Sequence, residues 1–471
     1  MLYHKLVESH LQREGVAVAD GYRSLSLRQL HHEAAQYNAY FTSLGLVQGD
    51  RVAVIDRNPI DTLLVLLACL AGGYVFVPIN VQTDERIKAA ILQDCSPRLL
   101  IEDVSALQNR NVREVERTVC SENAFVYLLY TSGTDGVPKG VAARQKQVLF
   151  CCETINERLR NNANDRILCS LPLSFDYGLY QIFLAFSSGA TLYFNPGNLI
   201  QGIPYLLRRW EITALPLVPS AANLMMYAKL LSAKDCLSLR YISFTGEVLS
   251  VELLRQLRRL LPSTELIPMY GLTECKRVSI MPPGREDKIF AGSCGQPIDG
   301  ITVQLQNVDL STGVGELVVE GPNVMTYWNI SDADSGKFST NQVTGQRRLK
   351  TGDLFRIDNE GFLYFCGRNS GILKVCGYRV STVWLENQAK AIDGVLEVAV
   401  LSCPDILTGE RPVFFLYLEN EIELVRVKNM IGELPSYLHS SILYDWKKPL
   451  PKNINGKVDR NRLAQFVKET F

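Results

Sequence analysis

The chain has 471 residues, and 49 Lys plus Arg residues balance 49 Asp plus Glu residues, so the formal net charge is zero. This balance argues against a nucleic-acid-binding protein, because phosphate binding needs a positive surplus. Hydrophobic residues make up 47% of the chain, which is typical of a globular protein and excludes a disordered one.

Helix-like and strand-like patterns alternate from the N-terminus onward. A helix is expected over residues 27–44, where Ser26 can serve as the N-cap, and the run RVAVID at 51–56 is typical of a strand. Further helices are expected at 59–71 and 84–94, and further strands at 74–79, 97–101, 124–129, 167–173, 213–218, 241–244 and 265–268. This alternation predicts an α/β fold with a largely parallel sheet.

The pattern changes after about residue 303, where short strands at 315–320 and 361–366 predict a β-rich subdomain. Beyond Arg368, the pattern predicts helices at 380–391 and 423–434 and strands at 395–402 and 412–418. We therefore predict a large N-terminal domain of α/β subdomains plus the β-rich subdomain over residues 1–368, and a small α+β C-terminal domain over residues 369–471.

Residues 62–83 contain no charged residue and are long enough to span a bilayer. Gly72-Gly73 and Pro78 divide this segment, which favours a buried helix, a turn and a buried strand instead. The N-terminus lacks the uninterrupted apolar core of a signal peptide. The 12 cysteines show no C-x-x-C spacing, so we expect reduced thiols in a cytoplasmic protein rather than a zinc site.

The string YTSGTDGVPKG at residues 130–140 follows an expected strand. Its glycines let backbone N–H groups approach an anion, its hydroxyls donate hydrogen bonds, and Lys139 supplies a positive charge. It is not the GxxxxGK[ST] loop, because neither the spacing nor the ending matches. A polar turn is the structural alternative, but a turn does not require the whole string. The sequence therefore predicts a phosphate-binding loop.

This string resembles the phosphate-loop signature of the acyl-adenylate-forming (AMP-binding) superfamily, which contains acyl-CoA synthetases, luciferases and the adenylation domains of nonribosomal peptide synthetases. The resemblance extends over nearly the whole chain. It implies a mobile C-terminal domain, with ATP and Mg²⁺ as cofactors and Lys139 as a catalytic residue. The loop residues implied in nucleotide binding are Thr131, Ser132, Gly133, Thr134, Gly136 and Lys139.

The string YGLTE at 270–274 resembles the YGxTE motif of this superfamily. The resemblance implies that Tyr270 stacks on adenine, that Thr273 contacts the α-phosphate, and that Glu274 helps to hold Mg²⁺, for which a carboxylate is a suitable hard ligand. The string TGEVL at 245–249 resembles the purine-side GGExL loop, with Thr245 in place of the first glycine. Nucleotide contacts are likewise implied for Gly246, Glu247, Met269 and Gly271.

Two further strings complete the resemblance. KTGD at 350–353 resembles the TGD motif, in which Asp353 would accept both ribose hydroxyls and Arg368 would also reach the ribose. NINGKVDR at 453–460 resembles the NGKxxR signature, in which Lys457 would reach the substrate carboxylate and the α-phosphate and stabilise the transition state. If each residue is taken alone, Asp353 can also be interpreted as a turn residue and Lys457 as a solvated side chain. The four motifs in order favour the functional roles.

Two positions depart from the family pattern. The string KVCGYR at 374–379 resembles the run after the family's hinge, in which Gly377 would line the passage for a pantetheine arm. The hinge position usually carries Asp or Lys, and Ser370 stands there in this chain. Gln145 stands where many relatives carry a histidine after the phosphate loop.

The string FDYG at 175–178 marks the expected acid pocket. In amino-acid-activating relatives an aspartate here holds the substrate α-ammonium, which implies that role for Asp176, although related fatty- and aryl-acid ligases can also retain an aspartate nearby. Arg277 would bind a second carboxylate, a phosphate or another polar group if it points inward, and would be solvated if it points outward. The resemblance also implies that this compact pocket is lined by further residues, namely Tyr177, Tyr180, Pro216, Ser243, Thr245, Met269, Arg277 and Val278.

These residues together predict ATP-dependent activation of a carboxylic acid, with an amino acid favoured, as acyl-AMP with release of pyrophosphate. The acyl group would then pass to the phosphopantetheine thiol of a separate carrier protein, because no carrier domain follows Lys457. An acyl- or aryl-CoA synthetase that uses free CoA is the alternative. A catalytically silent scaffold is a further one, against which the intact Lys139, Glu274, Asp353 and Lys457 argue. We expect no nucleic-acid or membrane partner.

Overall fold

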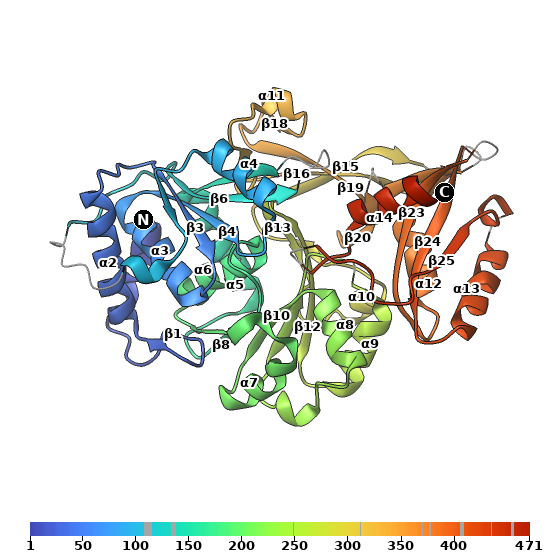
Figure 1. Cartoon of the computed structure of the whole chain (residues 1–471), viewed down its shortest axis with the longest axis horizontal. Helices are drawn as coiled ribbons and strands as arrows, with labels where there is room; N and C mark the ends of the chain where they lie inside the picture. The colour runs from blue at the N-terminus through green and yellow to red at the C-terminus, as the bar shows by residue number, and fades with distance from the viewer. Residues whose placement is uncertain are drawn as a thin grey trace.

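The computed structural model describes residues 1–107, 115–132, 138–247, 249–310, 312–368, 371–375, 378–405, 409–434, 436–453 and 456–471. A large α/β part makes up most of the molecule, and a smaller part of strands and helices, orange to red in Figure 1, lies at the other end. The predicted α/β class is therefore confirmed.

The first large sheet carries many of the expected site residues on its strands β10 to β13 and in the loops that follow them. Its neighbours in order are β14 (Gln296–Pro297), β13 (Cys275–Ile280), β12 (Glu265–Leu272), β11 (Tyr241–Phe244), β10 (Ala214–Leu217), β8 (Arg166–Cys169), β9 (Thr191–Phe194), β1 (Val18–Ala19) and β2 (Ser24–Leu25). The strands β10, β11 and β12 are parallel neighbours, so their carboxyl ends meet at one edge of the sheet. Ligands of open α/β sheets bind at such an edge.

The second large sheet supports the expected phosphate loop. Its order is β17 (Thr326–Tyr327), β7 (Pro138–Arg144), β6 (Phe125–Ser132), β4 (Val75–Asn80), β3 (Arg51–Asp56) and β5 (Leu99–Ile101). The inner strands β6, β4, β3 and β5 run parallel, whereas β7 returns antiparallel to β6 as a hairpin. The loop of this hairpin is the glycine-rich string.

Helices cover both sheets, and local signals explain their ends. The helices of the larger part are α1 (Leu2–Leu6), α2 (Leu27–Ser43), α3 (Pro59–Gly72), α4 (Glu85–Cys95), α5 (Gln145–Leu159), α6 (Asp176–Ser188), α7 (Ile203–Arg209), α8 (Pro219–Tyr227), α9 (Val251–Leu260), α10 (Glu286–Phe290) and α11 (Asp332–Ser335). Ser26 begins α2 with a capping box, and Gly73 ends α3 with a φ of +75°. The helix over the uncharged segment is thus confirmed, and no helix in the described ranges has the length and apolar character that crossing a membrane requires.

The β-rich region and the C-terminal end form separate sheets. The first contains β15 (Thr302–Asp309), β16 (Val314–Glu320), β19 (Arg347–Ile357), β18 (Phe338–Thr340) and β20 (Leu363–Arg368). The second contains β22 (Tyr378–Ser381), β21 (Ile372–Val375), β24 (Gly409–Leu418), β23 (Val395–Asp405) and β25 (Ile442–Asp445), with the helices α12 (Thr382–Lys390), α13 (Ile422–Glu433) and α14 (Arg460–Thr470). The C-terminal elements bury clusters of their own, and α12 packs against β20. The domain boundary after Arg368 stays a proposal.

Several strands have bounds that differ from the prediction, and for β8 and β12 the contacts show the reason. β8 stops at Cys169 rather than at residue 173, because Asp56 accepts hydrogen bonds from the backbone N–H groups of Leu173 and Ser174 and holds this segment outside the sheet. β12 continues past Pro268 to Leu272, because its second half pairs with β13 as an antiparallel hairpin. The described cysteines are free thiols, as expected.

Candidate active site

The expected phosphate loop is flanked in sequence by β6 and β7. Thr131 pairs with Lys139 across the hairpin, and its hydroxyl donates a 3.5 Å hydrogen bond to the Lys139 carbonyl. Ser132 is the last residue of β6. The predicted contacts of Gly133, Thr134 and Gly136 lie outside the described residues, so the structure places only the two flanks of the loop.

The β12–β13 hairpin presents the YGLTE string. A Cβ atom at Gly271 would lie 2.3 Å from the Lys276 carbonyl oxygen, so the close approach of the two strands requires glycine there. Met269 is buried beside Tyr270, and Thr273 lies in the turn before β13. Glu274 is also buried; it accepts a 2.7 Å hydrogen bond from the Tyr327 hydroxyl, and the Lys337 amine lies 3.7 Å away.

Asp353, on β19, joins two other residues that were expected at the nucleotide. The Tyr270 hydroxyl donates a 2.7 Å hydrogen bond to Oδ2 of Asp353, and Nε of Arg368 forms a 2.9 Å ion pair with Oδ1. Burial raises the pKa of Asp353, and the charge of Arg368 opposes this shift. Each carboxylate oxygen has two lone pairs, so the same carboxylate can still accept hydrogen bonds from ribose hydroxyls.

Lys457 extends from the C-terminal segment into the same region. A Cβ atom at Gly246 would lie 3.6 Å from Cε of Lys457, and Nζ lies 5.4 Å from the ring centre of Phe175. Burial lowers the pKa of Lys457, whereas the carboxylates of Asp176, Glu247 and Asp353 act in the opposite direction. The charge of Arg368 acts in the same direction as burial and also lowers this pKa.

Glu247 is held by the start of α8. Its Oε2 accepts a 2.8 Å hydrogen bond from the backbone N–H of Ser220, in the first turn of that helix. This is a favourable place for a carboxylate, because the first N–H groups of a helix have no partner within the helix. Gly246 and Glu247 are thereby fixed beside Lys457.

On the acid side, Asp176 is the first residue of α6 and already has a cationic partner. Nζ of Lys276, on β13, lies 2.8 Å from Oδ2 of Asp176, and the two side chains are only 1% and 13% exposed. Burial raises the pKa of Asp176, but Lys276, Arg277 and Lys457 outweigh this effect and hold the pKa below its ordinary value. Lys276 thus already supplies a cation to Asp176, and the ammonium contact implied for Asp176 stays a prediction.

The predicted pocket residues around Asp176 form a connected, buried group. The Tyr177 hydroxyl donates to the Ser243 carbonyl at 2.9 Å, and the Tyr127 hydroxyl donates to that of Tyr180 at 3.2 Å. Ser243 pairs with Pro216 on the neighbouring strand. The remaining predicted residues of this group, Thr245, Met269, Arg277 and Val278, are also buried. Burial of Arg277 excludes the solvated alternative.

Sequence reasoning missed two residues that position the site, and it noted Gln145 without its structural role. Asp56 anchors the segment before Asp176, as described above, and Lys276 neutralises Asp176. Gln145 accepts a 3.1 Å hydrogen bond from the backbone N–H of Leu2 and so ties the N-terminus to α5. The unusual Lys276-Arg277 pair was visible in the sequence, but nothing in the sequence indicated the partner of the lysine. Ser370 and Gly377 lie outside the described residues.

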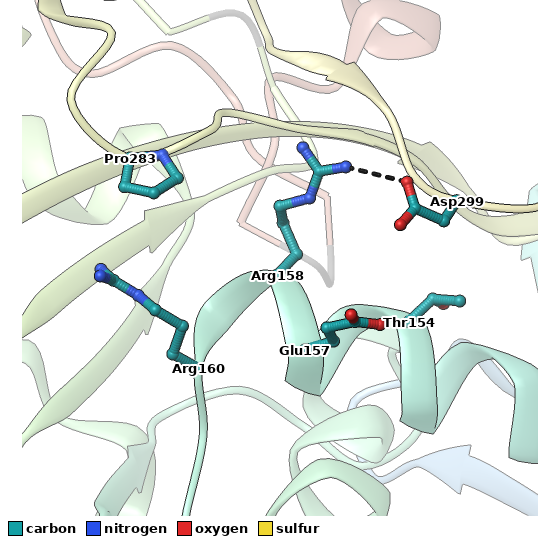
Figure 2. Close-up of a pocket in the computed structure, with 6 residues that line it drawn as sticks. All are labelled: Thr154, Glu157, Arg158, Arg160, Pro283 and Asp299. Carbon is teal, nitrogen blue, oxygen red and sulfur yellow. Dashed lines mark hydrogen bonds and ion pairs between the residues drawn. The ribbon is translucent and has the colours of Figure 1, made fainter.

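A separate surface pocket lies among α5, Pro283 and Asp299 (Figure 2). Its arginines already have partners: Arg158 forms an ion pair of 3.4 Å with Asp299, and Arg160 pairs with Glu265. None of the predicted site residues lines it. Among the described residues there is also no cluster of three or more His, Cys, Asp or Glu side chains that could hold a metal ion.

The order of these motifs along one α/β chain agrees with a known family. The family model described as AMP-binding enzyme matches residues 8–328. The chain belongs to the AMP-binding enzyme family. It is an AMP-forming ligase, as the family match and the ligase among its curated relatives support. The predicted family resemblance is thus confirmed.

This AMP-binding enzyme is 29% identical to the L-proline--[L-prolyl-carrier protein] ligase of Pseudomonas fluorescens strain Pf-5, over 96% of each chain. It is 26% identical to tyrocidine synthase 1 of Brevibacillus parabrevis, covering 98% of this chain but only 45% of that longer protein. In structure it is similar to ATP-bound MatB from Rhodopseudomonas palustris, with a TM-score of 0.88, 21% identity and coverage of 99% of both chains. The last comparison confirms the fold.

Proposed function

We propose that this AMP-binding enzyme uses ATP to activate a small carboxylic acid as acyl-AMP and then transfers the acyl group to a pantetheine thiol. The observation that supports this most directly is the position of Lys457, whose Cε would lie 3.6 Å from a Cβ atom at Gly246 and whose amine lies 5.4 Å from the Phe175 ring centre. A cation from the C-terminal segment thus lies between the expected nucleotide side and the expected acid side. Preorganised charge of this kind can stabilise an adenylation transition state.

In the first step, a carboxylate oxygen of the acid attacks the α-phosphorus of ATP, and the bond to the pyrophosphate leaving group breaks. We assign to the Lys457 amine the contact with both the carboxylate and the α-phosphate. Thr273 and the β6–β7 loop with Lys139 would hold the phosphates, while Tyr270, Asp353 and Arg368 would hold the nucleoside. Positioning of this kind accounts for much of the rate of such displacements.

Glu274 is the residue that we propose for Mg²⁺. One carboxylate fits this ion, because protein-bound Mg²⁺ keeps several waters and takes most other ligands from substrate phosphates. The Lys337 amine lies 3.7 Å from the Glu274 carboxylate, so it would have to move away when the ion binds. When bound, the ion would neutralise the charge of the leaving pyrophosphate.

The second step transfers the acyl group. A thiolate attacks the carbonyl carbon of acyl-AMP, and the bond to the phosphate oxygen of AMP breaks. We propose the phosphopantetheine thiol of a carrier protein as the acceptor and an amino acid as the substrate, supported by the proline- and carrier-specific name of the Pseudomonas relative. The free cysteines also support the prediction of a reducing compartment such as the cytoplasm.

A CoA ligase for an acid without an amino group is the second candidate. The Asp176–Lys276 ion pair favours it, because Asp176 is neutralised without any substrate ammonium. The acceptor can be tested directly by measuring AMP release with free CoA and with phosphopantetheinylated carrier protein. Release with the carrier protein alone supports the main proposal, and release with CoA alone supports the second candidate.

The test of the activation step is ATP–pyrophosphate exchange across amino acids, aryl acids and short fatty acids. Exchange that depends on an amino acid is the expected result. Exchange with other acids only would keep the adenylation step and reject the amino acid. If no acid supports exchange although Mg²⁺-ATP binds, the fold would serve as a catalytically silent scaffold and the proposal would be wrong.

A further inference from the structure

The acid side contains a buried guanidinium group that lacks a charged partner. Arg277 is only 1% exposed. Its Nε has no hydrogen-bond partner, and its guanidinium forms no ion pair, within the described part of the chain. The backbone at this position is fixed, because the Asn323 side chain donates a 2.7 Å hydrogen bond to the Arg277 carbonyl.

The neighbouring carboxylate is already used. Asp176 forms its 2.8 Å ion pair with Lys276, so one carboxylate faces two buried cations from consecutive residues of β13. An unpaired buried charge is costly, since its desolvation is not repaid by a partner. This part of the site therefore has a surplus of positive charge.

Stacking on an aromatic ring does not remove this cost. The Arg277 guanidinium carbon lies 5.3 Å from the Tyr177 ring centre, and the Lys276 amine lies 4.4 Å from the Tyr180 ring centre. Such cation–π contacts are much weaker than the cost of burying an unpaired charge. The rings shape the surroundings of the two cations, but an anion is needed to balance them.

The chemistry of the missing anion follows from the shape of the guanidinium. Its planar fork matches a carboxylate in a bidentate arrangement. The reacting carboxylate of the substrate is assigned to Lys457, so the anion at Arg277 must be a second group on the same molecule. The Arg277 guanidinium lies 5.3 Å from the Tyr177 ring centre and the Lys457 amine lies 5.4 Å from the Phe175 ring centre. Phe175 and Tyr177 flank Asp176 in the chain, so the two cations are near each other and the molecule is small.

We propose that the acid activated by this enzyme carries a second carboxylate, which Arg277 binds. The substrate class is thus a small dicarboxylic acid or an acidic amino acid. Oδ1 of Asp176 has no hydrogen-bond partner among the described residues, so it is free to accept from an α-ammonium while Lys276 holds Oδ2. This inference rests on the proposed adenylation function and narrows its substrate.

The experiment measures ATP–pyrophosphate exchange with matched acids that differ only in the second carboxylate. The pairs are succinate and butyrate, and L-aspartate and L-2-aminobutyrate, extended to shorter and longer chains. The enzyme is compared with Arg277→Met, Arg277→Lys and the control Arg158→Met, which removes a partly buried arginine of the surface pocket in Figure 2. Thermal unfolding is followed for every variant.

In each pair, we expect kcat/KM for ATP–pyrophosphate exchange to be about 100-fold or more higher with the acid that has two carboxylates than with its partner. The reason is that a buried charge pair is strongly selective. Arg277→Met should abolish most of this preference without lowering Tm, since it removes an uncompensated charge, whereas a purely structural arginine would lower Tm. Arg277→Lys should keep part of the preference, and Arg158→Met should keep all of it. Preference for succinate would assign a dicarboxylic acid, and preference for L-aspartate an acidic amino acid.

Exchange that favours acids with a single carboxylate would overturn this inference and leave adenylation intact. An unchanged preference in Arg277→Met would do the same, as would an equal loss with every acid together with a lower Tm. Absence of exchange with any acid, while Mg²⁺-ATP still binds, would instead overturn the proposed function and the inference with it.

Discussion

Asp353 on the nucleotide side and Asp176 on the acid side of the candidate active site are both largely shielded from solvent, but their charges are balanced differently. On the nucleotide side, Asp353 accepts a hydrogen bond from the Tyr270 hydroxyl and forms an ion pair with Arg368, whose side chain is 63% exposed. On the acid side, Asp176 faces two cations, Lys276 and Arg277, which are both about 1% exposed. Balanced charge suits the neutral hydroxyls of a ribose, whereas a buried positive surplus suits an anion.

The largest expected effect is at Lys457, between the two sides. Lys457→Ala should lower ATP–pyrophosphate exchange by about 10²–10³-fold, because one preorganised charge stabilising the transition state is lost. ATP affinity, measured by calorimetry, should change much less. Lys452→Ala is the matched control, since it lies on the same segment and pairs with Glu397 at 2.9 Å. Equal losses of exchange and ATP binding would contradict the assigned role.

Breaking the acid-side pair should lower the free energy of unfolding. Asp176→Ala leaves Lys276 and Arg277 buried without their carboxylate, which should cost about 3–5 kcal/mol in urea denaturation. The double variant Asp176→Ala/Lys276→Met should recover much of this loss. Removal of an exposed carboxylate in Asp299→Ala is the control. A fully stable Asp176→Ala variant would show that the pair is not needed.

The same variant sharpens the substrate assignment. If Asp176 also accepts an α-ammonium, Asp176→Ala should reduce ATP–pyrophosphate exchange with amino acids far more than with acids that lack an amino group. Unchanged exchange with amino acids would reject the ammonium contact.

On the nucleotide side, Tyr270→Phe removes one hydrogen bond to a charged acceptor and keeps the ring. The expected loss of unfolding free energy is about 1.5–3 kcal/mol, because hydrogen bonds to charged groups contribute this much. Tyr22→Phe, at a residue that is 89% exposed, is the control. Equal unfolding free energies of the two variants would indicate that solvent replaces the Tyr270 hydroxyl.

The pH dependence of stability tests the charge balance on the acid side without changing the ligand. Burial lowers the pKa of Lys276 to about 8, although the charge of Asp176 opposes this shift. Of the other groups that face the amine, Arg277 lowers the pKa further and Cys151 raises it. Above this pH the unfolded chain binds the proton and the folded chain does not, so the contribution of Lys276 to the unfolding free energy rises with pH. The slope is at most about 1.4 kcal/mol per pH unit.

Urea denaturation of the wild type and of Lys276→Met between pH 8 and the ordinary lysine pKa of 10.5 checks this sign. The unfolding free energy of the wild type should rise relative to that of the variant as the pH increases. A constant difference would place the titration of Lys276 outside this range.

Local patterns predicted the elements of the fold well. The strands β3 and β11 have the predicted bounds, and Ser26 caps α2 as expected. Such features depend on periodicity and on capping groups within a few residues. The ends of β8 and β12 were wrong, because Asp56 and β13, which come from distant parts of the chain, decide where these strands end.

The sequence by itself determined the α/β fold, the motifs and the chemistry that their residues can perform. Only the tertiary structure decided that Lys276 neutralises Asp176, across 100 residues of sequence, and that Arg277 is buried beside them. It also brought Lys457 to Gly246 and Phe175. Side-chain type is encoded locally, but charge balance depends on which segments packing brings together, and this balance defines the substrate that the site can accept.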